Sequence, residues 1–397
     1  MLRKWLPICI LIALLLASCG KGGAQTVKVA VSVPLGLDFG KDMLKAAELA
    51  LKEANGKAGK VTVELLVYDV SEPGGNPLST DLEMKYVPEA VADPAVIAYL
   101  GPIASQTAKG TIPILNRASI TQISASATWP GLTKPGYGPG EPGVYYPTGQ
   151  RTFFRTVPSD EVQGGAAARW AKQLGFQAVY IANDNSAYGT GIAGIFEVIA
   201  KDEGLRIVGH DTYDYDPKNV TPEDLAGIAA RVMIARPDLV YLGGGVGSNG
   251  ENLVEALRKV DPSIAIMGPD AMVMDELISG KGAAVVEGMY GTVAPAPAEK
   301  LNTPAATAFQ AAYQAAYGKQ PSPYAMSTYE AMKVLLYAIE HAKKVTRAGV
   351  LEAMQNLGDY TGVLGTWHFD AQGDTSANAI AGMQIQSGAW TFVQVLR

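Results

Sequence analysis

Strand patterns and helical patterns alternate along this chain, and the alternation begins twice. Alternating β-branched residues over 27–33 predict a strand, which is followed by a helical pattern over 40–55 and a second strand pattern over 61–67. A second series begins near Phe154, and its first clear strand pattern covers 178–183. Alternating strands and helices joined by short loops form a parallel sheet with helices on both faces. The sequence therefore predicts an α/β fold with two such sheets.

The length and the charge of the chain narrow the class of protein further. Its 397 residues, of which 48% are apolar, suffice for two domains of ordinary size. The formal net charge is −6 and basic residues rarely cluster, so the sequence offers no positive surface for nucleic acid or for an anionic membrane. We therefore expect a globular protein without a polyanionic partner.

The amino terminus has the pattern of a targeting signal. Two basic residues precede an apolar run over 6–17, which is too short to cross a bilayer as a helix. The run ends at Leu-Ala-Ser-Cys19, which resembles the bacterial lipobox, where the cysteine is lipidated. We predict a lipoprotein signal peptide over 1–18 and a lipid anchor on Cys19; a plain signal peptide cleaved nearby is the alternative. Cys9 is the only other cysteine, so no disulfide is expected in the mature chain.

Small hydroxyl residues follow two strands of the first predicted sheet. Ser105 follows a strand pattern that ends at Gly101, and Ser126 and Thr128 follow the next strand. The carboxyl ends of parallel strands form the edge at which open α/β sheets bind ligands. Small side chains there leave backbone N–H groups at the next helix start accessible to an anion. The loops predict a site for a small carboxylate; the alternative is that these residues only cap helices and turns.

The order of residues in both loops resembles that of the periplasmic binding proteins for leucine, isoleucine and valine. Gly-Pro-Ile-Ala-Ser105 is followed by Ser126-Ala127-Thr128. In that family a Ser in the first loop and an Ala-Thr pair in the second hold the carboxylate of an amino acid and help to hold its ammonium group. The resemblance covers nearly the whole chain from Val27, and it implies a type I fold of two lobes with the ligand between them.

The family topology assigns separated segments of the chain to each lobe. It implies three interlobe crossovers, near Arg155, Tyr290 and Gly365. Lobe 1 would then contain 26–155 with 290–365, and lobe 2 would contain 156–289 with 366–397.

Two residues of the second series match ligand positions of the family on the other lobe. The segment Asp184-Asn-Ser-Ala-Tyr188-Gly resembles a family motif whose Tyr reaches the ligand. Met-Gly-Pro-Asp270 leaves a strand where the family has an acidic residue, commonly Glu, that pairs with the ammonium group. Asp270 is one methylene shorter, so it requires a closer ligand or a bridging water. The alternatives are that Tyr188 only packs and that Asp270 only caps a helix.

A glycine-rich loop supports a competing interpretation. Gly245, Gly247 and Gly250 follow a strand in the spacing G-x-G-x-x-G, and Asp270 comes twenty residues later, as in a dinucleotide-binding fingerprint. The loop belongs to a late unit, however, whereas the fingerprint usually occupies the first strand–helix turn. Several relatives have an aromatic residue near Gly245, so its absence predicts a wider pocket, with Trp129 as a candidate apolar wall.

Two further features bear on function. Seven of the nine residues over 135–143 are Pro or Gly, which predicts an irregular insertion that either covers the cleft or packs on its own domain. His210, His341 and His368 have no metal-ligand spacing, and the G-x-S-x-G motif is absent from the sequence. We therefore expect no enzymatic activity, no metal and no cofactor.

Together these features predict a monomeric, lipid-anchored and extracytoplasmic protein that captures branched-chain or similar apolar amino acids for an ABC importer, with permease and ATPase subunits as partners. Ser105 and Thr128 would receive the carboxylate. Asp270 and the Ser126 carbonyl would receive the ammonium group, and Tyr188 would contact the ligand only after the lobes close. A sensory module for a small amide or organic acid, or a dinucleotide-dependent oxidoreductase, is the alternative.

Overall fold

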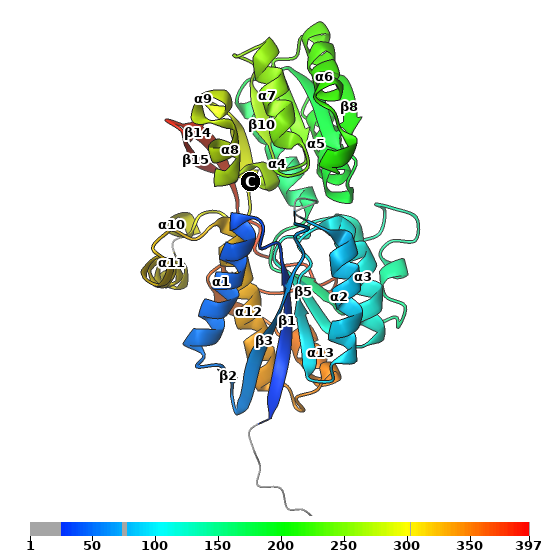
Figure 1. Cartoon of the computed structure of the whole chain (residues 1–397), viewed down its shortest axis with the longest axis vertical. Coiled ribbons are helices and arrows are strands. Elements are labelled where there is room, and N and C mark those ends of the chain that lie inside the picture. The colour runs from blue at the N-terminus through cyan, green and yellow to red at the C-terminus, as the bar shows by residue number, and fades with distance from the viewer. Residues whose placement is uncertain (1–24, 74–77, 302, 397) are drawn as a thin grey trace, which may run out of the picture.

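The computed structural model describes residues 25–73, 78–301 and 303–396, which form two lobes stacked along the long axis of the molecule (Figure 1). The predicted signal peptide and Cys19 lie outside the described residues. Each lobe contains one large β-sheet covered by helices, so the prediction of a two-lobed α/β fold is confirmed.

The sheet of lobe 1 has the strand order β2-β3-β1-β4-β5-β6, and all its neighbouring strands are parallel except β2 and β3. Helices α1, α12 and α13 pack on one face of the sheet, and α2 and α3 pack on the other. The strands are β1 (Thr26–Val33), β2 (Lys57–Ala58), β3 (Val61–Asp69), β4 (Val96–Leu100), β5 (Thr121–Ser124) and β6 (Phe153–Arg155). The helices are α1 (Asp38–Glu53), α2 (Thr80–Ala92), α3 (Ser105–Arg117), α11 (Pro304–Tyr317), α12 (Pro323–His341) and α13 (Arg347–Gln355).

The sheet of lobe 2 has the order β15-β14-β11-β10-β9-β7-β8. It is mixed rather than parallel throughout, because β14 and β15 join it in antiparallel orientation. The strands are β7 (Ala178–Asp184), β8 (Arg206–Tyr213), β9 (Leu239–Gly243), β10 (Ile266–Gly268), β11 (Tyr290–Val293), β14 (Ile380–Gln386) and β15 (Ala389–Leu396). The helices are α4 (Asp160–Gln173), α5 (Ala187–Asp202), α6 (Pro222–Ala235), α7 (Gly250–Val260), α8 (Asp275–Lys281), α9 (Ala283–Val286) and the 3₁₀ turn η4 (Asp270–Met272).

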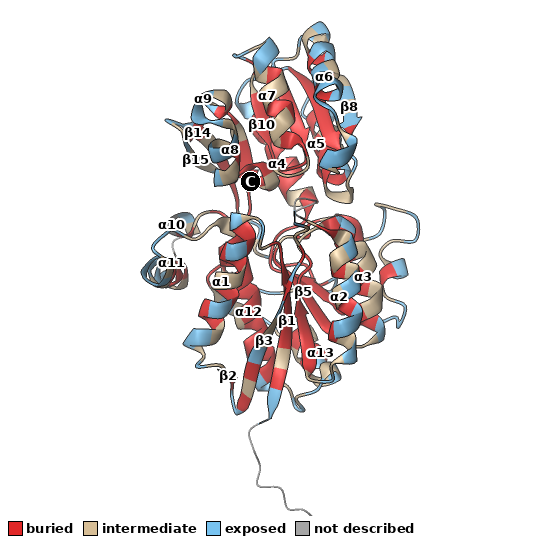
Figure 2. Cartoon of the chain, in the orientation of Figure 1, coloured by how far each residue is buried: buried red, intermediate tan, exposed pale blue. Residues whose placement is uncertain are grey.

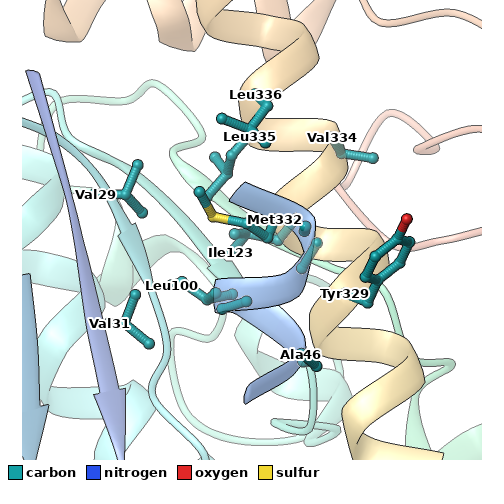
Figure 3. Packing of buried hydrophobic residues seen from close by; sticks show 14 of the residues in the cluster. Val29, Val31, Ala46, Leu100, Ile123, Tyr329, Met332, Val334, Leu335 and Leu336 are labelled. Carbon is teal, nitrogen blue, oxygen red and sulfur yellow. The ribbon is translucent and has the colours of Figure 1, made fainter. Parts of the chain in front are cut away.

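The core of lobe 1 lies between its sheet and the long helix α12. Val29 and Val31 of β1 belong to the same buried cluster as Met332 and Leu335 of α12, and all four are fully buried (Figure 3). Burying one such side chain contributes roughly 1.5–3 kcal/mol to stability. Figure 2 shows that burial is concentrated in the strands of both sheets. The loops at the carboxyl ends of these strands therefore start from firmly packed positions.

The structure moves two of the predicted lobe boundaries. The chain crosses between the lobes after β6, after β11 and again before β14. The boundary expected at Tyr290 is too early, because β11 pairs with β10 and β14 in the second sheet. The boundary expected at 365 is also too early, because Trp367 is buried in lobe 1, where its indole N–H donates a 2.7 Å hydrogen bond to Glu330. A local strand pattern does not show which sheet the strand joins.

The Pro/Gly-rich insertion over 135–143 packs next to the junction of the lobes. Glu141 accepts a 3.0 Å hydrogen bond from the Trp129 indole, and the Tyr137 hydroxyl donates to Glu161 at the start of α4. None of these residues lines the pocket between the lobes, and Tyr137 contacts lobe 2, so neither covering of the cleft nor packing on lobe 1 alone describes the insertion. Trp129 belongs to this packing, and its ring lies so close to Gly191 of α5 that a Cβ there would be 2.4 Å from it.

Candidate functional site

The lobes enclose a pocket of about 110 Å³ at the carboxyl ends of their strands. Ser105 and Ser126 line it from lobe 1, and Tyr188 and Asp270 line it from lobe 2. The fold therefore brings these four predicted ligand residues to one cavity. A cavity of this volume has room for a small molecule.

The lobe 1 side of the pocket is the first turn of α3. Ala104 is its N-cap and no side chain caps the turn, so its first backbone N–H groups have no acceptor within the helix. The Ser105 oxygen accepts hydrogen bonds from the backbone N–H groups of Thr128 and Trp129, both at 3.1 Å. The Ser105 oxygen acts as the acceptor in both bonds, so its hydroxyl proton remains available to donate a hydrogen bond to a ligand. This turn can bind an anion through N–H and O–H donors.

The second loop differs from the prediction. Its backbone N–H groups are already bonded within lobe 1, since Ser124 accepts from Ser126 and Ala127, and Ser105 accepts from Thr128. Ala127 is buried among apolar side chains beside α3, and Thr128 is buried with its hydroxyl near the Asp160 carboxylate. Neither of these two residues lines the pocket. Only Ser126 of this loop borders the cavity, and its hydroxyl donates to the Ile103 carbonyl at 2.9 Å.

Asp270 lies at the lobe 2 side of the pocket and is 5% exposed. Its Oδ1 accepts hydrogen bonds from the Tyr188 hydroxyl at 2.5 Å and from the Gln163 amide at 2.9 Å. Its Oδ2 accepts a 2.6 Å hydrogen bond from the Tyr324 hydroxyl. Burial, followed by the charge of Asp270, raises the pKa of both tyrosines, which keeps both hydroxyl groups protonated as donors. The helix-capping alternative is not observed, because Asp270 begins a 3₁₀ turn without a side-chain cap.

Gln163 and Tyr324 are the two partners of Asp270 that the sequence patterns do not identify. Gln163 lies on α4, directly after the first crossover, and Tyr324 is the second residue of α12. The Ser322-Pro323 pair marks the start of α12, since Ser322 caps it. No sequence signal indicates that this helix start faces the other lobe.

The electrostatic potential in the pocket is negative, because its charged lining residues are acidic. Asp184 and Asp270 line it, and none of its lining residues is Lys, Arg or His. Asp160 is fully buried, and its burial together with the charge of Asp270 raises the pKa of its carboxyl to about 7. A cationic group therefore binds here more favourably than an anionic group that has only the α3 turn to hold it.

In the glycine-rich loop between β9 and α7, the N–H groups of the three glycines in the fingerprint spacing are not free to bind a pyrophosphate. The N–H of Gly245 donates to Ser248, and the N–H of Gly247 donates to the Glu251 carboxylate, both at 3.1 Å. The N–H of Gly250 donates to the Gly245 carbonyl at 3.2 Å. Because the donors are already used and a carboxylate lies beside them, these contacts disfavour a dinucleotide. The loop instead forms part of the wall of the interlobe pocket.

Gly245 does not widen the pocket, in contrast to the expectation from the missing aromatic residue. A Cβ at this position would lie 2.6 Å from the Cβ of Ala271, so the η4 turn occupies the space that a side chain would need.

We therefore expect Gly245→Ala to push η4, and Asp270 with it, out of position. Overpacking of this kind costs typically about 1–3 kcal/mol, so both the melting temperature and the ligand affinity should fall. Gly194→Ala is the matched control, because Gly194 lies within α5 with no atom near its would-be Cβ. That substitution should leave the affinity unchanged and raise the melting temperature slightly. Scanning calorimetry and ligand titration measure both effects.

Comparison with known proteins identifies the family. A family model described as periplasmic binding protein matches residues 26–389. The chain belongs to this family. Among the relatives of this periplasmic binding protein, the Leu/Ile/Val-binding protein homolog 1 of Brucella abortus is 26% identical over 378 residues, which cover 94% of each chain. The leucine-, isoleucine-, valine-, threonine- and alanine-binding protein of Pseudomonas aeruginosa is 26% identical, over 88% of this chain and 87% of that protein.

Solved structures share the fold of this periplasmic binding protein. The leucine-binding protein LivK of Thermotoga maritima matches with a TM-score of 0.81 at 24% identity, covering 94% of this chain and 99% of that one. A solute-binding protein of R. palustris in complex with benzoate matches with a TM-score of 0.76 at 16% identity, covering 94% and 96%. Proteins of the family bind small molecules outside the cytoplasm for ABC transporters. Among the described helices, none combines the length and the apolar character needed to span a bilayer.

Proposed function

We propose that this periplasmic binding protein is the substrate-binding component of an ABC importer, and that its ligand is a branched-chain or similar apolar amino acid. One observation carries the proposal: a single small-molecule pocket has an uncapped helix start on one lobe and the Asp270 carboxylate on the other. An amino acid presents an anion and a cation on one carbon atom. The names of the two curated relatives support the same ligand class.

The mechanism follows from the position of each group. The α3 turn and the Ser105 hydroxyl receive the carboxylate, Asp270 receives the ammonium group, and Phe39 and Met274 contact the apolar side chain. Because the two charged ends are held by different lobes, the ligand binds the closed state better than the open state and shifts the population toward it. The permease and ATPase subunits would respond to this closed form.

The lipobox pattern at 16–19 supports an anchor for the mature protein. Acyl chains on Cys19 would hold a monomer on a bacterial membrane, outside the cytoplasm. Cys19→Ala would then release the protein from the membrane fraction without changing its affinity for ligand.

Titration calorimetry with leucine, isoleucine and valine tests the proposed ligand class. We expect dissociation constants in the micromolar range or below, about −8 kcal/mol or stronger. Glutamate should bind much more weakly, because the residues that line the pocket include no Lys, Arg or His to pair with a second carboxylate. Binding of benzoate without binding of any amino acid would contradict the proposal and favour an organic acid.

Ser105→Ala is expected to weaken amino-acid binding by roughly ten- to a hundredfold, because it removes a donor to the carboxylate. The substitution also leaves two backbone N–H groups without their acceptor. Ser124→Ala is the matched control, since Ser124 likewise accepts from two N–H groups of the same loop but does not line the pocket. Both variants should lose stability, and only Ser105→Ala should lose affinity in calorimetry. Equal losses of affinity would show that the conformation of the loop, and not the Ser105 hydroxyl, determines the affinity.

A further inference from the structure

A second cavity, of about 480 Å³, lies beside the ligand pocket. It is found where α8 and β15 of lobe 2 face α1 and the start of α12 of lobe 1 (Figure 1). Its volume is within the roughly 300–1,000 Å³ of ordinary small-molecule sites, whereas the ligand pocket, at about 110 Å³, is below that range. The two cavities together therefore have room for a larger ligand than the pocket alone.

Three residues, Phe39, Met274 and Tyr324, line both cavities. The Tyr324 hydroxyl is bonded to Asp270 and its ring contacts Phe39, with centroids 5.6 Å apart, so these two rings are held in place. The carbonyl of Met274 accepts a 3.2 Å hydrogen bond from the Trp390 indole, which holds its backbone. A methionine side chain, however, has three rotatable bonds and adapts to a changed neighbour. Of the three shared side chains, that of Met274 is therefore the one that can move aside for a ligand.

The wall of the second cavity beyond Met274 is largely apolar. Val293, Met326 and Met383 line it and are buried. The Trp390 ring also lines it and lies against β11, where a Cβ on Gly291 would be 3.1 Å from the ring. An apolar chain that enters this cavity is thus removed from water on several sides.

The charged residues of the second cavity are mostly acidic. Lys319 is the single base among the described residues that line it, and it forms a 2.8 Å ion pair with Asp42. The other charged lining residues are Asp38, Asp275 and Glu276. A ligand chain that ends in a carboxylate would therefore meet a negative potential here, and an uncharged end would not.

We propose that the second cavity extends the ligand site and receives the outer part of a side chain longer than that of leucine. The ligands that bind best are then amino acids with long apolar side chains. The inference rests on the proposed function for the place of the carboxylate and of the ammonium group. Because Met326 belongs to lobe 1, whereas Val293 and Met383 belong to lobe 2, such a side chain contacts both lobes and favours the closed state.

A series of unbranched amino acids tests the extension by titration calorimetry. The probes are 2-aminopentanoate, 2-aminohexanoate, 2-aminoheptanoate and 2-aminooctanoate. We expect the affinity to rise by roughly fourfold with each added methylene up to the longest probe, the gain from burying one such group. 2-Aminooctanedioate has the same chain length as the longest probe but ends in a carboxylate, so it should lose this gain. An affinity that peaks at 2-aminohexanoate, an isomer of leucine, would overturn the extension.

Val293→Phe fills the second cavity from a residue that does not line the ligand pocket. It should remove the gain of the longer probes and leave the affinity for 2-aminopentanoate unchanged. Val254→Phe is the matched control, because Val254 is also a buried valine of lobe 2 but lines neither cavity, and the gain should persist in it. Ser279→Trp fills the same cavity from an exposed position on α8 and should act like Val293→Phe, so the test does not depend on the folding of one variant.

The corresponding unbranched fatty acids, hexanoate to octanoate, separate the extension from the proposed function. If no amino acid binds, but the fatty acids bind with the same gain per methylene and Val293→Phe removes it, the proposed ligand class is wrong and the extension stands. If leucine binds and the longer probes gain nothing, the extension is wrong and the proposed function stands. A gain that persists in both filling variants would also overturn the extension, because the chain would then lie elsewhere. If neither series binds, both are wrong.

Discussion

Asp270→Asn is expected to weaken the binding of leucine, or of whichever apolar amino acid binds best, by roughly a hundredfold. The amide keeps the size of the side chain but removes the negative charge that faces the ammonium group. No Lys, Arg or His lines the pocket, so the field at this position depends on the acidic residues alone. A charged hydrogen bond shielded from water contributes about 1.5–3 kcal/mol, which corresponds to this loss. Titration calorimetry at neutral pH measures it.

Glu276→Gln is the matched control for the charge. Glu276 lies on the same lobe, outside the ligand pocket, and accepts a hydrogen bond from the Phe39 N–H across the lobe boundary. The amide oxygen of Gln can still accept that bond, so only one negative charge is lost, and the affinity should change by less than about threefold. Unaltered binding to Asp270→Asn would show that the ammonium assignment is wrong. Equal losses in both variants would mean that the general field, not contact with Asp270, controls affinity.

The parts of the site that were predictable from the sequence are those that follow directly from strand ends. Ser105, Tyr188 and Asp270 each come a few residues after a strand that a local pattern marks. Parallel strands place such residues at one edge of their sheet whatever the rest of the chain does. Strand ends place these residues at the ligand-binding edge, and the resemblance to the Leu/Ile/Val-binding proteins is what assigned Tyr188 and Asp270 to the ligand.

The parts that were not predictable depend on how the two lobes meet. Tyr324 lies at a helix start of lobe 1 and reaches Asp270 only because of the angle between the lobes, whereas Gln163 lies within α4 and reaches Asp270 through the packing of lobe 2. Thr128 was expected at the carboxylate but turns away, because Ser105 takes its N–H and the hydroxyl faces Asp160. A side chain can point to either side of a loop, and the hydrophobic pattern of the sequence does not show which side it takes.

The boundaries of the lobes were also not predictable from local sequence patterns. β11 joins the second sheet, but its partner β14 comes about ninety residues later in the chain. Pairing over such a separation is decided by packing of the completed sheet rather than by local propensity.

Asp160→Asn is expected to make the protein more stable at pH 8 and to change its stability little near pH 4. Asp160 is fully buried at the first turn of α4, and no described donor makes a hydrogen bond of normal geometry to either carboxylate oxygen. Burial raises the pKa of its carboxyl to about 7, although the nearby Thr128 hydroxyl lowers it. Ionising this group in the folded protein is therefore unfavourable.

The sign of the pH dependence follows from proton binding. Between about pH 4 and pH 7 the folded protein holds the Asp160 proton, whereas the unfolded chain releases it near the ordinary aspartate pKa. The free energy of unfolding therefore falls as the pH rises through this range. Above about pH 7 the folded protein carries the full free-energy cost of the ionised, buried Asp160 carboxylate. Removing the ionisable group should recover up to a few kcal/mol at pH 8.

Denaturant unfolding of both proteins at pH 4.5 and pH 8 measures this effect. Glu83 is also fully buried, where burial raises the pKa of its carboxyl to about 7, so Asp160→Asn should reduce the slope without abolishing it. Glu161→Gln is the neighbouring control: burial raises the pKa of Glu161, but the hydrogen bond from Lys134 and other donors lower it overall. That variant should lose stability at pH 8 relative to pH 4.5. If Asp160→Asn instead lost stability at pH 8, the ionised carboxylate would have to be stabilised by the fold, contrary to its buried surroundings.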